Sequence, residues 1–403
     1  MNLLFVLPAY EPAWAFGGVV RAMSSLCRGL ASLGHQVTVY NTNSMAPGAS
    51  GPWPGGAAVD QGGVATYYFP PTFGAGRVWD SRALRHRLRR TVGQFQLVYV
   101  SAIWQWLGIG AAAICTAQGV PLVVGPHGSF DQALRRRHRW RKTLYWRWFL
   151  KRSLGRAAAL HFTTDHERQE SADLLSRLAG FVVPNALDCD YFCPLPERGA
   201  AFRRRHGLAP EAPVVLSVGR PDAKKRLDLL IQSLARLPEL NLLVVGPDQG
   251  PVARGWKALA AAMGVAGRVI FTGHLEGETL VQAYAAGDVL ALLSDDENFG
   301  NVVVEAMACQ LPVLVSPRVG AWEEVQDAQV GRAVPLNTAA VIEALGDFLR
   351  ERARWAAWGQ NGRRVAQECF AAPTVAALMA RAFQDVLTGA RSPECRWLEA
   401  SRS

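Results

Sequence analysis

The 403-residue chain lacks the cysteine pattern of a disulfide scaffold or a structural zinc site. Its seven cysteines are an odd number, are scattered, and include no Cys-x-x-Cys pair, which favours a reducing, cytoplasmic environment. The first residues lack a basic leader followed by a long apolar core, so we interpret them as a first strand and expect no secretory signal. No Gly-x-Gly-x-x-Gly follows that strand, which disfavours a dinucleotide-dependent oxidoreductase.

Charged side chains are missing from residues 91–130. A stretch of this length has to be tested as a transmembrane helix, but Gln105, Gln118 and several glycines interrupt it and Pro121 breaks it. A buried helix at 103–117 followed by a buried parallel strand at 121–124 explains the same pattern. We therefore favour a helix and a strand of a soluble core over a membrane span.

Acidic side chains are scarce in the first half of the chain. Residues 1–185 hold 20 Lys or Arg and 8 Asp or Glu, whereas residues 186–403 hold 23 and 25, so the net charge of +10 arises in the first half. The excess indicates an anionic partner. Residues 133–156 carry ten cations, no acid and five interleaved aromatic side chains. We expect this segment to lie on an anionic membrane surface. The alternatives are a solvated surface helix and a nucleic-acid site, which is disfavoured because no nucleic-acid-binding motif accompanies the segment.

Short apolar runs alternate with segments of helical period along nearly the whole chain. In the second half we expect strands at 214–218, 242–245, 269–271, 289–293 and 313–315, with helices at about 227–237, 253–263, 278–285 and 301–309. In the first half we expect strands at 3–7, 37–40, 97–100 and 122–124, a helix over 19–33, and a long surface loop around one short strand at 44–74. The fold class is therefore α/β, with two Rossmann-like doubly wound domains that face each other across a cleft.

The domain boundaries follow from composition and length. The chain is too long for one ordinary domain and fits two of about 200 residues each. We place the first domain at 1–185 and the second at 186–375, because the chain turns polar and proline-rich near Pro184–Pro196. Residues 376–403 are expected to form a helix that packs back toward the first domain, with a frayed tail from Gly389.

Two carboxylates flank the expected start of a helix. Glu297 follows a buried strand, and seven residues separate it from Glu305. A helix start near Gly300 and Asn301 offers free N–H groups and a positive dipole end, which suit a phosphate. The carboxylates could accept hydrogen bonds from the hydroxyls of a sugar and a ribose. The alternative is that Glu297 caps the helix and Glu305 is a solvated helical residue.

Four cations cluster at the end of another strand: Arg220, Lys224, Lys225 and Arg226, with only Asp222 among them. They would repel one another without an anion, and both residue types suit phosphate oxygens. The alternative is a solvated basic turn.

Together the two motifs resemble those of the retaining enzymes of glycosyltransferase family 4, which have the GT-B fold. The segment from Glu297 to Cys309 looks like the family's Glu-x7-Glu element, and Gly219-Arg220 with Lys225 looks like its diphosphate-binding pair. The resemblance covers nearly the whole chain through supporting segments at 8–18, 34–39, 126–128, 183–185 and 271–275. One departure is Gln310, which stands where the family usually has a glycine, at a helix stop that favours a positive φ.

The resemblance implies that the first domain, 1–185, binds the acceptor and that the second domain, 186–375, binds the nucleotide sugar. It also implies a role for each matching residue. Arg220 and Lys225 would hold the donor diphosphate and stabilise the leaving group. Glu305 would bind ribose hydroxyls, and Glu297 the hydroxyls of the transferred sugar. The amides around Phe299, Gly300 and Asn301 would bind the distal phosphate, and Leu275 would lie beside the base. His127 would face the sugar from the opposite domain. Gly17 and Gly18 would let the donor or acceptor approach the backbone closely.

The implied activity is transfer of a hexose-type sugar from a nucleotide-diphosphate sugar to a glycan or lipid-linked acceptor in cell-surface polysaccharide synthesis, at the inner face of the membrane. The base, sugar, acceptor, linkage and oligomeric state stay open. We expect no cofactor and no metal, since the cations and the helix end neutralise the diphosphate and since Asp295 and Asp296, adjacent in a strand, would point to opposite faces. The alternative functions are a GT-B sugar-nucleotide epimerase and a non-catalytic glycan- or membrane-binding scaffold. The intact site residues disfavour the scaffold.

Overall fold

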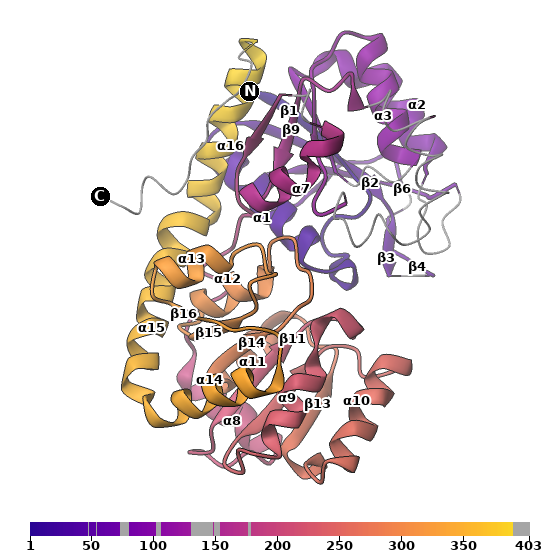
Figure 1. Ribbon diagram of the computed structural model, residues 1–403. Coiled ribbons are helices and arrows are strands. Elements are labelled where there is room, and N and C mark those ends of the chain that lie inside the picture. The colour runs from indigo at the N-terminus through magenta and orange to yellow at the C-terminus, as the bar shows by residue number, and fades with distance from the viewer. Residues whose placement is uncertain are drawn as a thin grey trace. The chain divides into compact units, whose positions relative to one another are not determined.

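The protein was analysed as a computed structural model, which describes residues 1–46, 48–53, 55–72, 80–101, 106–129, 148, 154–175 and 179–389. The chain forms two compact α/β units (Figure 1). The first unit comprises Met1–Leu187 and Cys369–Ser403, and the second comprises Asp188–Glu368. The limits expected from the sequence are 185/186 and 375/376.

The first unit is built on an eight-stranded sheet in the order β10-β9-β8-β7-β1-β2-β6-β5. All neighbours pair in parallel except β5 and β6. The strands are β1 (Asn2–Leu7), β2 (Gln36–Thr42), β5 (Val59–Asp60), β6 (Ala65–Phe69), β7 (Leu97–Ser101), β8 (Leu122–Gly125), β9 (Ala159–Phe162) and β10 (Gly180–Val182). Central strands such as β1 and β7 are buried almost throughout, because helices cover both faces of a parallel sheet.

The expectation of a single short strand within residues 44–74 was wrong. The described part of this region contains β5, β6 and a small antiparallel pair, β3 (Ser44–Ala46) and β4 (Ala49–Ser50). Strand β6 pairs in parallel with β2 and buries Tyr68. The abundant Gly and Pro of the connections favour the prediction of a loop, because both residues are strong turn signals. For that reason the aromatic run of β6 was not recognised as a full strand of the sheet.

Helices α1 (Gly18–Ser32) and α16 (Ala372–Leu387) cover one face of this sheet (Figure 1). Met23 and Leu26 of α1 share a core with Phe5 of β1 and with Met379 and Phe383 of α16. A Cβ at Gly29 would lie 2.6 Å from the Ala372 carbonyl oxygen, so the glycine permits the close approach of the two helices. The last helix that the structure describes, α16, therefore belongs to the first unit.

The charge-free stretch forms a helix followed by a strand, which confirms the favoured interpretation. Helix α3 (Trp106–Ala117) precedes β8, and α3 packs beside α2 (Arg82–Thr91). Another helix, α7 (Asp165–Leu175), follows β9. Within the described residues, none of the helices combines the length and the apolar character needed to cross a membrane. Most of the basic segment 133–156 and the tail after Gly389 lie outside the described residues.

The second unit is a six-stranded parallel sheet in the order β13-β12-β11-β14-β15-β16. Its strands are β11 (Val214–Val218), β12 (Asn241–Val245), β13 (Val269–Gly273), β14 (Val289–Leu292), β15 (Val313–Val315) and β16 (Gly331–Ala333). The five strands expected here are all present, and β16 is an addition that its short, partly exposed run of Gly, Arg and Ala concealed.

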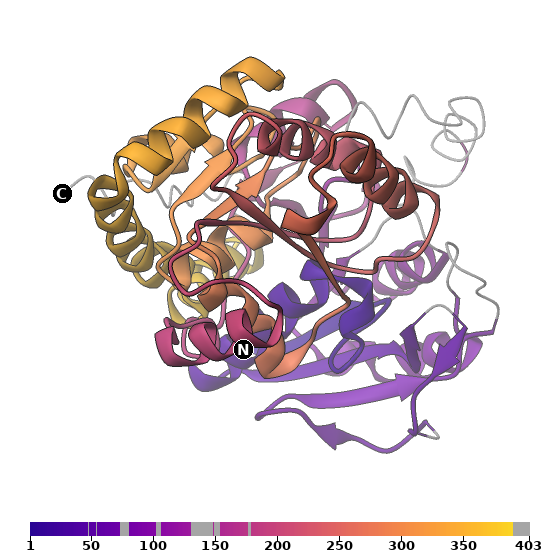
Figure 2. The same ribbon diagram turned by 90° about the horizontal axis from the view of Figure 1, so that it is seen from below.

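Helices lie on both faces of this second sheet (Figure 2). Leu230 of α9 (Leu227–Leu234), Ala260 of α10 (Pro251–Ala262) and Leu345 of α14 (Thr338–Arg350) share one core with alternate strand residues such as Leu242 and Val289. Helices α11 and α12 contact the sheet through β11, β14 and β15. The helices of this unit are α8 (Pro196–Arg205), α9 (Leu227–Leu234), α10 (Pro251–Ala262), α11 (Gly277–Ala286), α12 (Asn301–Ala308), α13 (Trp322–Asp327), α14 (Thr338–Arg350) and α15 (Arg352–Val365).

Candidate active site

The strand order of the second unit locates a site before any side chain is considered. The chain proceeds from β11 outward to β12 and β13, then returns to the other side of β11 with β14 and continues to β15 and β16. In open parallel sheets, the loops that leave the carboxyl ends of the strands separate at such a reversal and leave room for a ligand. The two loops concerned are 219–226 and 293–300, which hold the cationic and the acidic motif.

Glycines allow these loops to approach each other closely at the strand ends. Gly219 and Gly246 directly follow β11 and β12, with φ values of 146° and 154°. A Cβ at Gly246 would lie 2.0 Å from the Gly219 carbonyl oxygen, so no other residue fits there without moving the loop that carries Arg220. Asp222 then caps the short helix η4 (Ala223–Lys225) by accepting a hydrogen bond from the Lys224 N–H at 3.1 Å.

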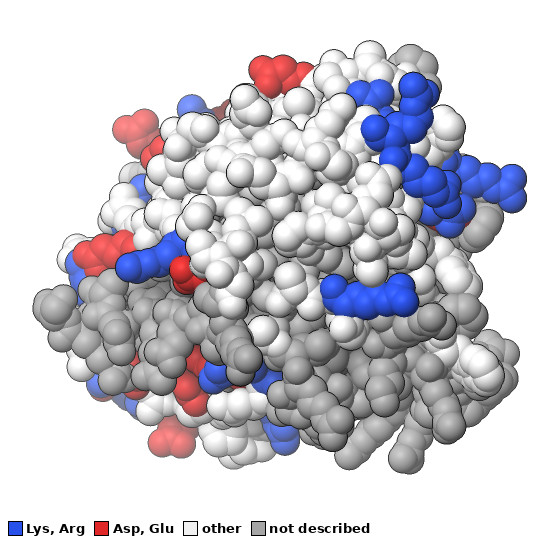
Figure 3. All heavy atoms as spheres, turned by 90° about the horizontal axis from the view of Figure 1, so that it is seen from above, with Lys and Arg blue, Asp and Glu red and all other residues white. Residues whose placement is uncertain are grey.

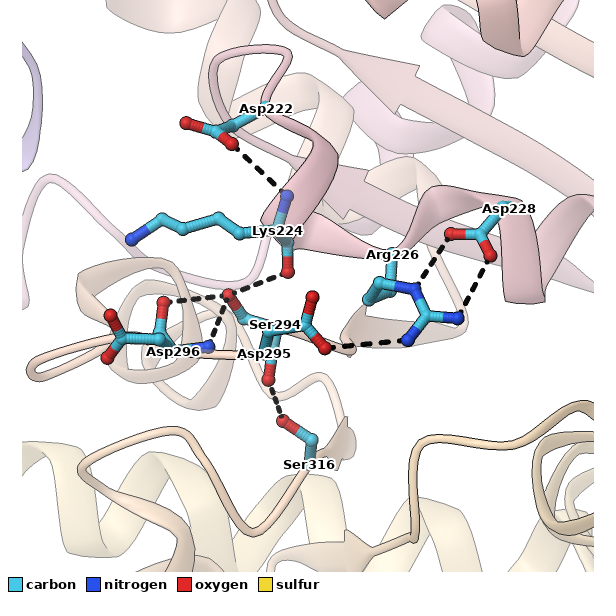
Figure 4. Close-up of polar contacts among 8 residues, drawn as sticks. All are labelled: Asp222, Lys224, Arg226, Asp228, Ser294, Asp295, Asp296 and Ser316. Carbon is cyan, nitrogen blue, oxygen red and sulfur yellow. Dashed lines mark hydrogen bonds and ion pairs between the residues drawn. The ribbon is translucent and has the colours of Figure 1, made fainter. Parts of the chain in front are cut away.

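Two of the four cations are paired with carboxylates, two of which lie far from them in the sequence. The Arg226 guanidinium donates two bonds of 3.1 Å to the Asp228 carboxylate and one of 3.4 Å to Asp295 (Figure 4). These carboxylates raise the pKa of Arg226 above its ordinary value. The Lys225 ammonium donates to Glu297 Oε2 at 3.0 Å. No described residue pairs with the side chain of Arg220 or Lys224, so these two cations remain for an anion.

The backbone locks the two loops together. The Lys224 carbonyl oxygen accepts a hydrogen bond from the Asp295 N–H at 2.7 Å and from the Ser294 hydroxyl at 3.2 Å. The Ser316 hydroxyl, at the end of β15, donates to the Ser294 carbonyl oxygen at 2.5 Å (Figure 4). The cationic loop and the acidic loop therefore form one rigid element at the end of the sheet.

Glu297 is held at both its backbone and its side chain. Its N–H donates to the Arg318 carbonyl at 3.0 Å, and its carbonyl accepts from the Gly320 N–H at 2.8 Å. The Lys225–Glu297 ion pair brings together two residues that the sequence analysis placed in one site. Because both side chains are partly exposed, at 17% and 25%, a ligand can reach them. Glu297 does not cap α12, so that alternative was wrong.

Helix α12 begins with Gly300 at its N-terminal cap, in the left-handed region at φ 88°. A Cβ there would lie 2.8 Å from Val319, so both the backbone angle and the packing require glycine. Phe299 is buried and Asn301 is half-buried. No side chain caps this helix, and its first amides lie beside the Glu297 loop, where a phosphate would find hydrogen-bond donors.

Glu305 is only 2% exposed, so the alternative of a solvated helical residue was wrong. The phenol of Tyr284, on α11, donates to Glu305 Oε2 at 2.5 Å. Tyr284 is fully buried and packs edge-on against Phe192. Tyr284 could not be found from the sequence, because 21 residues separate it from Glu305 and no local pattern connects them. At the helix stop, Gln310 has φ 63°, the positive value expected there.

The expected base-side segment lies at the end of β13, two strands from β11. Gly273 ends the strand with φ 77°, and Leu275 is half-buried. His274 pairs with Glu276 at 2.7 Å. Since neighbouring strands lie about 4.8 Å apart, this segment is roughly 10 Å from the cationic loop along the same edge.

The remaining expected residues belong to the first unit. Gly17 has φ 95°, caps α1 and has no atom near its hypothetical Cβ, so its backbone is open. Gly18 is the first residue of α1. His127 follows β8 in a turn and has φ 47°, which is unusual for a residue with a side chain. Its Nε2 lies 3.0 Å from the Tyr99 hydroxyl. Burial, together with the neighbouring His161, lowers the pKa of His127 to about 3.

Metal-binding clusters are missing from the part of the chain that the structure describes: it contains no group of three or more His, Cys, Asp or Glu side chains able to hold a metal ion. Asp295 is paired with Arg226. Asp295 and Asp296 lie in a loop, because β14 ends at Leu292. The prediction that Asp295 and Asp296 lie in a strand was therefore wrong.

The geometry agrees with comparisons to known proteins. A family model described as glycosyl transferases group 1 matches residues 200–365, and one described as glycosyltransferase family 4 matches residues 16–191. Sucrose-phosphate synthase from Thermosynechococcus elongatus superposes with a TM-score of 0.74 at 22% identity, over 96% of this chain and 100% of that chain. Anabaena Alr3699/HepE, in complex with UDP and glucose, gives 0.74 at 20% identity, over 95% and 99%. The fold and the matches define a glycosyltransferase with the GT-B fold.

Within that class, the chain belongs to glycosyltransferase family 4. A curated relative, the GDP-mannose-dependent alpha-(1-6)-phosphatidylinositol monomannoside mannosyltransferase of Mycolicibacterium smegmatis, is 29% identical over 82% of this chain and 85% of its own length. The D-inositol 3-phosphate glycosyltransferase of Xylanimonas cellulosilytica is 37% identical over 53% of this chain and 54% of its own length. The chain is an enzyme that transfers sugars.

Proposed function

We propose that this enzyme transfers a hexose-type sugar, with retention of anomeric configuration, from a nucleotide-diphosphate sugar to a glycan or lipid-linked acceptor in cell-surface polysaccharide synthesis. The observation that carries the proposal is the locked pair of loops after β11 and β14. They bring unpaired cations, a partly exposed carboxylate and a helix start together at the reversal of strand order. Complexes of Alr3699/HepE with UDP and with UDP-glucose support a donor of this kind.

Different residues bind the diphosphate and the transferred sugar of the donor. Arg220 and Lys225 neutralise the diphosphate and stabilise the negative charge that develops on it as the sugar leaves. The amides from Phe299 to Asn301 bind the distal phosphate. Glu297 then releases part of its contact with Lys225 and accepts hydrogen bonds from the transferred sugar. Such bonds strengthen when the sugar ring becomes electron-deficient, so they favour the transition state.

The nucleoside lies along the same edge. Glu305 accepts the ribose hydroxyls, with Tyr284 holding its carboxylate, and Leu275 packs beside the base. In the first unit, Gly17 and Gly18 allow a substrate to approach the backbone, and His127 accepts a hydrogen bond from a sugar hydroxyl.

No metal or other cofactor takes part in this scheme, since cations and amides supply the positive charge. Transfer that is unaffected by excess chelator supports this point, and transfer restored only by a divalent ion contradicts it.

The activity test begins with a thermal-shift panel of nucleotide sugars, since a ligand at 100 times its Kd stabilises the folded state by about 2.7 kcal/mol. The donor that binds is then incubated with candidate acceptors. Release of nucleoside diphosphate only when an acceptor is present supports transfer, whereas interconversion of the donor sugar without an acceptor identifies an epimerase. The anomeric configuration of the product, read by NMR, tests retention: an inverted product contradicts it.

We also propose that the first unit binds anionic membranes peripherally. Arg82, Arg89 and Arg90 are exposed on α2, which has no acidic residue. Figure 3 shows Lys and Arg side chains gathered at one edge of the first unit, over α2. Arg85 and Arg87 of the same helix are engaged, one with Asp80 and the other above the Tyr67 ring. The basic segment 133–156 adds ten cations to the same unit. Each cation near an anionic leaflet contributes about 1 kcal/mol.

A further inference from the structure

A chain of hydrogen bonds runs beneath His127 through the core of the first unit. The Tyr99 hydroxyl, on β7, lies 3.0 Å from His127 Nε2 and 2.9 Å from His161 Nδ1, on β9. His161 Nε2 lies 2.7 Å from the Val183 carbonyl oxygen. Tyr99 and His161 are buried, at 0% and 1% exposure. We refer to Tyr99 and His161 below as the relay.

The end of this chain fixes the position of every proton in it. The Val183 carbonyl can only accept, so His161 Nε2 carries a proton and donates. Burial lowers the pKa of His161 to about 4, so the ring is neutral and its Nδ1 is a bare acceptor. Tyr99 must therefore donate its single proton to His161. The phenol stays protonated, because burial raises the pKa of Tyr99 well above its ordinary value.

With its proton committed, the Tyr99 oxygen can only accept from His127. His127 Nε2 therefore carries a proton and Nδ1 is bare. No described residue lies within hydrogen-bonding distance of that buried Nδ1 atom. A bare ring nitrogen accepts a hydrogen bond from a hydroxyl and has no proton to offer a phosphate oxygen. The ligand chemistry that fits is a hydroxyl group.

The surrounding turn is shaped for the same contact. Glu167 accepts a hydrogen bond from the Gly128 N–H at 2.5 Å and from the Thr163 N–H at 2.7 Å, which holds the turn against β9. At Gly125, a Cβ would lie 1.9 Å from the Tyr99 hydroxyl oxygen and 2.9 Å from His127 Nε2. Glycine at this position therefore leaves the space in which the Tyr99–His127 bond forms.

We propose that Tyr99 and His161 are positioning residues that hold His127 as the neutral, Nε2-protonated tautomer, so that its Nδ1 accepts a hydrogen bond from a substrate hydroxyl. The identity of the substrate rests on the proposed function, but the tautomer does not. A wrong tautomer would turn a donor N–H toward the hydroxyl and leave the buried Tyr99 oxygen without a donor.

The first test is the tautomer itself, in the full-length, ligand-free protein. Protein labelled with 15N-histidine gives separate long-range 1H–15N patterns for protonated and bare ring nitrogens, and the eight histidines can be assigned with His127→Asn and His161→Asn. We expect Nε2–H and a bare Nδ1 in both His127 and His161 from pH 7.5 to pH 5.5. The titratable groups that face the two histidines are Tyr99, which bonds both, and each other; Glu167 bonds the backbone N–H of Gly128, next to His127. A cationic His127, or one protonated on Nδ1 at pH 7, overturns the proposal without reference to the enzyme's substrates.

The second test separates positioning from stability. Tyr99→Phe removes the acceptor for His127, and a lost bond of this kind reduces kcat/KM about tenfold, with the His127 signals showing mixed tautomers. Tyr40→Phe is the matched control, because it removes another buried phenol of the same sheet, bonded to Thr91 at 3.0 Å and Arg87 at 3.2 Å. It should lower stability alike and leave kcat/KM within about twofold. Equal kinetic losses in the two variants contradict a positioning role.

The third test concerns the atom that meets the substrate. His127→Asn places an acceptor oxygen near the position of Nδ1, whereas His127→Gln places its amide near Nε2 and the relay. We expect His127→Asn to keep a kcat/KM at least tenfold higher than His127→Gln. The reverse order would mean that Nε2 carries the function. If the chain proves inactive with every donor, the NMR result still decides whether the relay sets the tautomer.

Discussion

Replacing Gly246 with alanine should disrupt the cationic loop 219–226, although Gly246 lies outside that loop. The added Cβ would lie 2.0 Å from the Gly219 carbonyl oxygen, about 1.4 Å closer than the 3.4 Å at which ordinary contact begins. Inserting a methyl group into such a packed position costs about 1–3 kcal/mol. The backbone at φ 154° adds roughly 1–2 kcal/mol for a residue with a side chain. We therefore expect the free energy of unfolding to fall by about 2–5 kcal/mol.

The matched control is Gly255→Ala in α10, where a Cβ would meet no atom within 4 Å. Because alanine is the better helix former, this change should raise the free energy of unfolding by about 0.5–1 kcal/mol. Urea unfolding measures both changes, and calorimetry with nucleoside diphosphates measures the donor site. Gly246→Ala should weaken nucleotide binding at least tenfold, because the displaced Gly219 carries Arg220 with it. A Gly246→Ala variant within about 0.5 kcal/mol of the wild type would refute the close approach on which this reasoning depends.

Three further predictions concern a half-buried arginine, two buried histidines and the exposed arginines of α2. Arg363→Ala should lower the free energy of unfolding, measured in urea, by about 2–4 kcal/mol, because Arg363 Nη1 donates to the carbonyls of Cys189, Phe192 and Ala308 at 2.7–2.9 Å. The control is Arg364→Ala, which removes an exposed ion pair with Glu368 and should lower the free energy of unfolding by less than about 0.5 kcal/mol. Equal losses in the two variants would contradict the account. Unfolded histidines titrate near about 6.5, above the values of about 3 and 4 that burial gives the pKa of His127 and His161. Acid therefore protonates the unfolded chain first, so stability should be full above about pH 6.5 and fall from there toward pH 4; a urea midpoint equally pH-dependent in His161→Asn would contradict this. Binding to anionic vesicles should fall when Arg82, Arg89 and Arg90 are changed together to Gln and when salt rises, since the Debye length shrinks from about 10 Å at 0.1 M to about 3 Å at 1 M; co-sedimentation that is equal with neutral vesicles would remove the membrane proposal.

Most of the buried parallel strands could be predicted from the sequence, because they are short, β-branched and separated by segments of helical period. Strands β9, β10 and β16 were not predicted. The cationic and acidic loops could be found because strand ends of a doubly wound sheet share one edge. The pairing between them could not. Lys225 and Glu297 lie 72 residues apart, and only the strand order shows that β11 and β14 are neighbours.

Buried polar partners were hidden for the same reason. Tyr99 and His161 are 62 residues apart, and in the sequence each is one apolar-flanked residue of an ordinary buried strand. Tyr284 is similarly concealed within α11. The hydrogen-bond partners of their polar atoms can be assigned only when the folded structure shows which donors and acceptors lie within reach.

The central claim is that the loop after β11 binds the diphosphate of the donor, and calorimetry on one pair of variants tests it most directly. UDP, GDP and ADP are titrated into the wild type, Arg220→Ala and Arg236→Ala. Arg220 and Arg236 are both exposed arginines of the second unit, but Arg236 lies beyond the far end of α9. For the nucleotide that binds the wild type, the account predicts an affinity 10- to 100-fold lower in Arg220→Ala, for the loss of about 1.5–3 kcal/mol of charge-assisted bonding, and an unchanged affinity in Arg236→Ala. Equal affinity in all three proteins would contradict it.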